Sequence, residues 1–123
     1  MLKSQNEKLQ KEINSLKENQ VEDLKINLIQ GTNYNSGYHQ FKVYKLNNNL
    51  IKLSGLINCT YDYNKPICQL PENCRPKGTL IFTTMKNGNT LVRVDIKSDG
   101  NVCVDTTGSG WLSLDGISFI AGL

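Results

Sequence analysis

The first residues of the chain repeat an apolar side chain at an interval of seven. Leu2, Leu9 and Leu16 stand seven residues apart, and Ile13 falls between the last two. On an α-helix this spacing gathers the side chains into one narrow stripe, which is the seam of a coiled coil. An isolated helix of this length is only marginally stable in water, so the stripe needs partner helices. The pattern predicts a coiled-coil stalk over residues 1–23 with these four residues in its seam.

Polar residues also enter the predicted seam, and the pattern leaves alternatives open. Asn6 and Gln20 occupy core positions that alternate with the leucines. Such residues weaken a coiled coil but help to set its register, and the leucine positions are compatible with two strands as well as three. The other interpretation is one amphipathic helix lying on its own head, although a stripe this narrow suits packing on a globular core poorly.

The apolar period changes after residue 23. Residues 24–28 alternate apolar and polar side chains, and the polar, glycine-containing stretch 30–37 follows. Alternation is typical of a strand with one buried face, whereas clusters of Asn, Ser, Thr and Gly are typical of loops. We therefore divide the chain into a stalk (1–23), a connector (24–38) and a head (39–123).

The head consists of short β-type segments separated by turn signals. Asn87-Gly88 and Asp99-Gly100 both favour hairpin turns. Pro66, Pro71 and Pro76 predict a loop over residues 58–78, with at most a brief strand at 67–70. Other strands are expected near residues 41–46, 50–57, 79–84, 90–96, 102–104, 111–114 and 117–120. We predict a mainly β chain in which the coiled-coil helix is followed by a small, barrel-like antiparallel β-sandwich.

Charge and composition argue against several classes of partner. The formal net charge is +3 and no run of Lys or Arg occurs, whereas a nucleic-acid-binding face needs clustered basic residues. No segment approaches the ~20 apolar residues of a membrane-spanning helix. The charged N-terminus also lacks the apolar core of a secretory leader. We expect neither nucleic-acid binding nor membrane insertion.

The cysteines offer no pattern for a metal site. Cys59, Cys68, Cys74 and Cys103 form no C-x-x-C pair, and His39 is the one histidine of the chain. We predict four reduced thiols, some packed as small apolar side chains. Two disulfides are the alternative for a secreted chain.

No residue arrangement typical of catalysis stands out. A G-x-S-x-G sequence is absent, and no predicted helix follows Gly108-Ser109-Gly110, as a phosphate-binding loop would need. Several carboxylates leave a glycosidase pair as an alternative. Asp99 and Asp115, however, precede glycine as turn formers, and Asp95 is expected to face solvent from the middle of a strand. We predict that the chain is not an enzyme and holds no cofactor or metal.

One loop has the composition of a sugar-binding surface. Tyr61, Asp62, Tyr63 and Asn64 follow one another in a polar stretch. Tyrosine rings offer apolar faces for stacking, and the neighbouring Asp and Asn offer hydrogen-bond partners for hydroxyl groups. We predict these four residues as a receptor-binding site. The alternative is that the two tyrosines are packed loop anchors.

Other aromatic residues are weaker candidates for binding. Trp111 begins an apolar strand, which favours a place in the core or in a subunit interface over a ligand platform. Tyr34, Tyr38 and His39 lie in or beside the predicted connector, where the sequence gives them no defined surroundings.

Four short motifs in the head resemble one known group of proteins. They are Leu53-Ser54-Gly55-Leu56-Ile57, Leu70-Pro71-Glu72-Asn73-Cys74-Arg75-Pro76, Val94-Asp95-Ile96 with Ser98-Asp99-Gly100-Asn101-Val102, and Gly110-Trp111-Leu112-Ser113-Leu114-Asp115-Gly116-Ile117-Ser118-Phe119. Their order and spacing, over about residues 50–120, resemble the head domain of bacteriophage tail-fibre and baseplate receptor-binding proteins. Position 74 departs from that pattern, because it holds Cys where an aromatic residue is expected.

The resemblance implies a small β-sandwich head that forms a homotrimer about a parallel coiled coil. It also implies a protein of the virion, made in the host cytoplasm, that attaches to a host-surface receptor, commonly a saccharide. The stalk would join it to other tail or baseplate proteins. Arg75, Pro76 and Trp111 are interpreted as fold-forming residues of the motifs. A purely structural fibre tip or spacer and a glycan-cleaving tip enzyme are the alternative functions.

Overall fold

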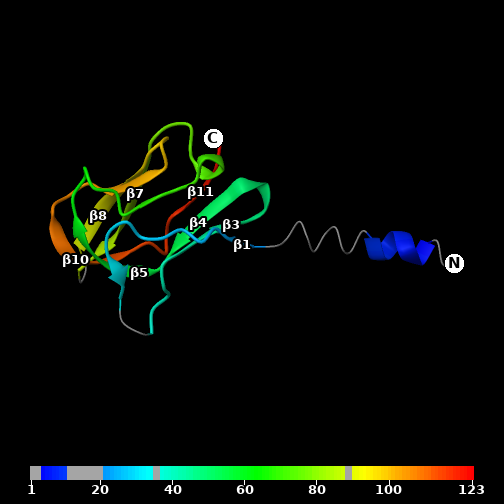
Figure 1. The fold of residues 1–123 in the computed structure, drawn as a ribbon, viewed down its shortest axis with the longest axis horizontal. Helices are drawn as coiled ribbons and strands as arrows, with labels where there is room; N and C mark the ends of the chain where they lie inside the picture. Colours follow the sequence, from blue (N-terminus) through cyan, green and yellow to red (C-terminus); the bar gives the residue numbers. More distant parts are fainter. Residues whose placement is uncertain (1–3, 11–20, 35–36, 88–89) are drawn as a thin grey trace.

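Two antiparallel β-sheets form the head of the protein (Figure 1). The computed structural model describes residues 4–10, 21–34, 37–87 and 90–123. The smaller sheet has the order β1 (Glu22–Asp23), β3 (Lys42–Lys45), β4 (Leu50–Ser54), β11 (Ser118–Ile120). The larger has the order β2 (Thr32–Asn33), β5 (Leu56–Tyr61), β10 (Gly108–Ser113), β7 (Leu80–Lys86), β8 (Thr90–Ile96), β9 (Asn101–Val104), β6 (Cys68–Gln69). The prediction of a mainly β, antiparallel, sandwich-like chain is therefore confirmed.

Short 3-10 turns and hairpins connect these strands. The turns η1 (Asn47–Asn49) and η2 (Glu72–Cys74) precede β4 and β7 respectively. The long hairpin β7–β8 pairs Leu80 with Ile96 at its open end and Lys86 with Thr90 beside the turn. This hairpin was expected from the alternating residues on both sides of Asn87.

Alternate residues of the strands fill the core between the sheets. The side chains of Ile51 and Leu53 in β4, Ile57 in β5, Val94 in β8 and Leu112 in β10 all have 0% exposure. Burying one aliphatic side chain of this size contributes roughly 1.5–3 kcal/mol. The period-2 pattern of the sequence thus reflects real burial, because side chains one position apart point to opposite faces of a sheet.

The end of the predicted stalk and the predicted connector each contribute a strand to the head, one to each sheet. β1 pairs with β3 and β2 pairs with β5, while the partly buried side chains of Leu24, Ile26 and Leu28 pack against the core. The alternation of residues 24–28 is thus the alternation of a segment that lies against the head. The stalk boundary predicted at residue 23 also differs, because Glu22 and Asp23 already pair as a strand.

Residues 4–10 and 21–23 of the predicted stalk lie in the part of the chain that the structure describes. Residues 4–10 are helical, and Leu9 is 56% exposed. Leu2, Ile13 and Leu16 lie outside the described residues, so the seam stays a prediction. Within the described ranges no helix is long and apolar enough to cross a membrane.

A sharp bend at Gly55 separates β4 from β5. Gly55 has φ +118°, and a Cβ atom there would lie 2.7 Å from main-chain atoms of Gln40 and Phe41. Glycine alone combines this backbone conformation with such a close approach. After the bend β5 continues to Tyr61, so the loop predicted over residues 58–78 is wrong at its start. The expected brief strand near residues 67–70 is β6.

All four cysteines are free, buried thiols. Burial raises the pKa of Cys59 to about 11 and that of Cys68 to about 12, and it also raises the pKa values of Cys74 and Cys103. The thiolate is the reactive form of cysteine. These side chains therefore act as small apolar core residues rather than as nucleophiles.

Candidate functional site: an aromatic cavity on the larger sheet

An aromatic cavity of about 310 Å³ opens on the larger sheet. It lies where β5, β10 and β7 neighbour one another, and its volume is near the low end of the ~300–1,000 Å³ of small-molecule sites. The lining residues combine three aromatic rings with two apolar and two polar side chains: Tyr34, Tyr38, Trp111, Leu56, Met85, Ser113 and Asp115.

The alternation of β10 turns Trp111 towards this cavity. Leu112, which pairs with Ile57, is fully buried in the core. Its neighbours Trp111 and Ser113 therefore point to the opposite face of the sheet, where both line the cavity. Trp111 is half-buried and forms a wall of an open cavity, so the place in the core expected from its strand is wrong. The alternative expectation, a place in a subunit interface, stays a prediction.

The backbone of Trp111 is fixed on both sides. Its N–H donates to Asn87 Oδ1 at 3.0 Å, and its carbonyl accepts from the Asn87 N–H at 3.3 Å. The Tyr61 hydroxyl donates to the same carbonyl at 2.5 Å. Asn87 Nδ2 also donates to the Ser109 carbonyl at 3.1 Å. The main chain that carries the indole ring is thus held by β5 and by Asn87, the residue that follows β7.

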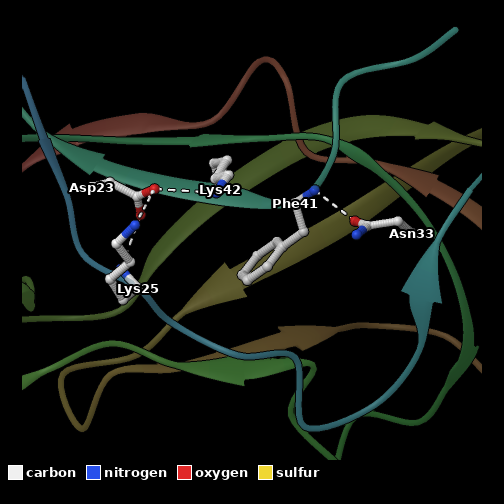
Figure 2. Close-up of polar contacts among 5 residues, drawn as sticks. All are labelled: Asp23, Lys25, Asn33, Phe41 and Lys42. Carbon is white, nitrogen blue, oxygen red and sulfur yellow. Dashed lines mark hydrogen bonds and ion pairs between the residues drawn. The ribbon is translucent and has the colours of Figure 1, made fainter. Parts of the chain in front are cut away.

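Tyr34 and Tyr38 enter the cavity from the segment between β2 and β3. Their rings meet edge to face, with centroids 5.7 Å apart. The base of this segment is closed by the Phe41 N–H, which donates to Asn33 Oδ1 at 2.6 Å (Figure 2). Tyr34 N–H also donates to the Leu56 carbonyl at 2.8 Å. These bonds bring two tyrosines from the predicted connector up to the sheet.

Asp115 supplies the carboxylate of the cavity. Its Oδ1 accepts a hydrogen bond from the Gly55 N–H at 2.7 Å, and Leu114 N–H donates to the Gly55 carbonyl at 2.8 Å. The Asp115-Gly116 turn is therefore clipped to the bend between β4 and β5. Asp115 itself remains exposed, so its carboxylate is accessible from the cavity.

The four residues predicted as a receptor-binding site are not among the described residues that line this cavity. Tyr61 is 2% exposed and belongs to the core, so its ring has no free face for a ligand. Asp62 Oδ1 accepts from the Asn64 N–H at 2.9 Å, which closes a local turn. Tyr63 donates its hydroxyl to Asp95 Oδ2 at 2.8 Å, and Lys97 Nζ lies 4.3 Å from its ring centroid. Their contacts fit the alternative of packed loop anchors.

Asp95 is buried, contrary to the solvent-facing position expected from its strand. It is 1% exposed and accepts hydrogen bonds from Arg93 Nε at 2.8 Å and Arg93 Nη2 at 2.9 Å, besides the one from Tyr63. The Arg93 hydrogen bonds hold the pKa of Asp95 below its usual value, although burial opposes them. The bond to Asp95 in turn raises the pKa of Tyr63. A further Arg93 nitrogen lies 3.5 Å from Asp105.

A second cavity, of about 280 Å³, is lined mainly by the segment 23–28 and by residues 40–42. Figure 2 shows its charged wall, where Asp23 accepts from Lys42 Nζ at 3.2 Å and from the Lys25 N–H at 2.9 Å. The hydrogen bond from the Lys25 main chain, followed by that from Lys42, lowers the pKa of Asp23. These groups already satisfy one another, so the aromatic cavity is the stronger candidate.

Metal binding has no support in the described part of the chain, where no group of three His, Cys, Asp or Glu side chains is placed to hold an ion.

Sequence reasoning missed the aromatic cavity because its walls come from three separate regions. The available signal was the aromatic pair Tyr34 and Tyr38 in a polar stretch.

Comparisons with protein-family models, curated proteins and solved structures yield no match.

Proposed function

We propose that the chain is the receptor-binding head of a homotrimeric bacteriophage tail-fibre or baseplate protein, which attaches the virion to a saccharide on the host surface. The observation that carries this proposal is the aromatic cavity. Its elements have the chemistry of sugar recognition: ring faces that stack on the apolar side of a sugar, and Ser113 and Asp115 that hydrogen-bond hydroxyl groups.

The assembly follows from the resemblance of the head motifs and from the heptads of residues 1–23. Three copies that bury their leucine seams together present three cavities on one particle. Linking weak sites raises overall avidity by about 10²–10⁴ over one site. In this proposal the same stalk joins the head to the other tail or baseplate proteins, and the protein is part of the virion.

The proposal is binding without catalysis. A glycosidase of the usual kind needs two carboxyl groups, roughly 5–9.5 Å apart, on either side of the scissile bond. Asp115 is the one carboxylate among the described residues that line the cavity. Incubation with host surface polysaccharide is therefore expected to release no reducing sugar, and sustained release would favour the glycan-cleaving alternative.

Adsorption to cells tests the attachment function. The labelled full chain is expected to bind a subset of bacterial strains and to compete with intact phage for them. Tyr38→Ser, which removes a 60% exposed ring from the cavity, should weaken adsorption at least about fivefold, since aromatic stacking contributes on the order of 1 kcal/mol.

Ile29→Ser is the matched control, because Ile29 is 59% exposed but does not line this cavity. It should adsorb like the parent chain. Absence of adsorption to every strain of a broad panel would instead favour the structural tip or spacer. Equal loss in both variants would mean that the aromatic cavity is not the contact surface.

A further inference from the structure

The charge in the aromatic cavity is negative. Asp115 is the one ionisable side chain among its described lining residues apart from the two tyrosines, and none of these lining residues is Lys, Arg or His. Oδ1 of Asp115 is engaged by the Gly55 N–H, whereas its second oxygen has no hydrogen bond or ion pair within the described residues. One carboxylate oxygen is therefore left for a ligand.

The aromatic walls add to this negative character. The π face of an aromatic ring carries partial negative charge and attracts a cation that lies within about 6 Å of the ring centroid. Tyr34, Tyr38 and Trp111 supply three such rings around one small cavity. An anionic ligand would meet these rings and the carboxylate with no compensating cation.

Lys52 is the positive group that contacts this turn. Its Nζ donates to the main-chain carbonyl of Asp115 at 3.3 Å, and it neither lines the cavity nor forms an ion pair with the carboxylate. Lys52 therefore weakens the attraction of the cavity for a cation but does not turn that attraction into repulsion. Such an exposed interaction is worth no more than about 1 kcal/mol.

We infer that the ligand of this cavity carries a positively charged amine, and that its chemical class is an amino sugar unit of a surface glycan. This inference rests on the proposed attachment function and specifies its receptor. The amine lies against the aromatic faces and pairs with the free oxygen of Asp115, while the sugar hydroxyls reach Ser113. Uronic acids, sialic acids and phosphorylated sugars are disfavoured.

A fluorescence titration tests the charge preference directly. Trp111 is the one tryptophan of the chain, so its emission reports on the cavity wall. The probes are methyl glucosaminide, methyl N-acetylglucosaminide and methyl glucuronide, titrated into the full chain at pH 6 and low salt. The cationic sugar should bind about fivefold or more tighter than its neutral N-acetyl counterpart, and the anionic sugar weakest.

Asp115→Asn separates charge from shape. The amide oxygen still accepts the Gly55 N–H, so the turn is retained while the negative charge is lost. The preference for the cationic sugar should fall to about twofold or less, the part that the aromatic faces alone supply. Asp99→Asn is the matched control, because Asp99 is also an exposed Asp-Gly turn residue whose carboxylate accepts a main-chain N–H.

Equal binding of the amino and N-acetyl sugars, or a preference that survives Asp115→Asn unchanged, would overturn the amine inference and leave saccharide attachment intact. Binding of none of the three sugars would also overturn the inference. The proposed function then stands or fails separately, on whether the full chain adsorbs to bacterial cells.

Discussion

Tyr61 contacts the main chain of the candidate site from the core. Its ring is buried in the core, and its hydroxyl reaches the carbonyl of Trp111, the residue whose indole forms a wall of the cavity. Burial raises the pKa of Tyr61 to about 12, so the hydroxyl stays protonated and able to donate at neutral pH. The residue chosen from the sequence as a ligand contact is thus a positioning residue for another aromatic side chain.

Tyr61→Phe is expected to weaken this support without emptying the core. Loss of one intramolecular hydrogen bond should lower the free energy of unfolding by about 0.5–1.5 kcal/mol. The Trp111 emission of the folded chain should also shift, because its backbone keeps only the Asn87 contacts. Urea unfolding followed by circular dichroism measures the first effect, and native-state fluorescence the second.

Tyr44→Phe provides the comparison, because Tyr44 is half-buried in β3 and no hydrogen bond to its hydroxyl is found within the described residues. It should change stability by less than about 0.5 kcal/mol. If both variants leave the Trp111 emission and the unfolding curve unchanged, the hydroxyl of Tyr61 does not position Trp111.

The sequence predicts which face of a strand a residue occupies better than it predicts what covers that face. Asp95 lies opposite Val94 and Ile96, as expected, but the loop that carries Tyr63 folds over it and Arg93 neutralises it. Trp111 likewise faces away from the core, yet its surroundings come from a segment about 75 residues earlier in the chain. Such tertiary contacts have no local signal in one sequence.

Among the elements, the bend at Gly55 connects the fold to the site. It turns the chain from the smaller sheet into the larger one, and its N–H and carbonyl hold Asp115 and Leu114. The position of the carboxylate in the cavity therefore depends on a glycine conformation in the middle of a buried strand pair.

Gly55→Ala is expected to be strongly destabilising. The added Cβ would lie 2.7 Å from the main chain of Phe41 in a backbone conformation that alanine adopts at a cost, which predicts a loss of about 2–5 kcal/mol. Gly78→Ala serves as the control, because its Cβ meets nothing within 4 Å. That variant should stay within about 1 kcal/mol of the parent. Urea unfolding at one fixed protein concentration measures both, and comparable losses would contradict the assigned role of Gly55.

The ion pair on β8 predicts how stability depends on pH. The pKa of Asp95 is lowered in the folded chain, chiefly by Arg93. Its contribution is therefore complete well above the unfolded pKa of about 3.9 and is lost as pH falls through the lower folded value. Thermal unfolding should show a falling midpoint below about pH 4. Tyr63 and Lys97 also act on this carboxylate, and Asp105 pairs with Arg93.

Asp95→Asn isolates this contribution. At pH 7 the variant should be about 1–3 kcal/mol less stable, because Arg93 and Tyr63 lose a charged acceptor. Between about pH 5 and pH 2, the range around the ordinary pKa of an Asp carboxyl group, the thermal unfolding midpoint of the variant should fall less steeply than that of the parent. Asp99→Asn removes one negative charge at an exposed position. Its unfolding midpoint should keep most of the parent's dependence on pH. Identical slopes for the parent and Asp95→Asn would rule out the ion pair as a source of acid sensitivity.

At the scale of elements, periodicity identified nearly all of the strands but not their ends. The hairpin β7–β8 follows directly from its alternating residues and its Asn87 turn. Three segments outside the predicted strands are strands in the structure: Glu22–Asp23, Thr32–Asn33 and Asn58–Tyr61. Each of them pairs with a neighbouring strand. Edge and partner effects of this kind override local preference.

At the scale of the whole molecule, the head alone leaves apolar surface uncovered. Ile81 is 61% exposed and Leu91 is 64% exposed, and the alternation of β7 and β8 places both on the outward face of the larger sheet. Leu9, at 56% exposure on the described helical turn, belongs to the predicted seam. Apolar side chains in these places are what a chain that assembles with its own copies would present.

The homotrimer is tested by mass and by one seam variant. Light scattering coupled to size exclusion should give a mass near three chains for the full protein. Leu9→Glu places a charge in the seam of every helix, and three buried carboxylates at one level repel one another, so the mass should fall towards one chain. The head is expected to keep its β-sheet circular dichroism, because its core is built from residues after 21.

Lys8→Gln changes the neighbouring position, which faces away from the predicted seam, and should leave the trimer intact. A monomeric parent chain would refute the stalk, and a stable dimer would keep the coiled coil but remove the threefold arrangement. A trimer that survives Leu9→Glu would move the assembly contacts from the stalk to the exposed face of the head, where Ile81 and Leu91 would be the next positions to change.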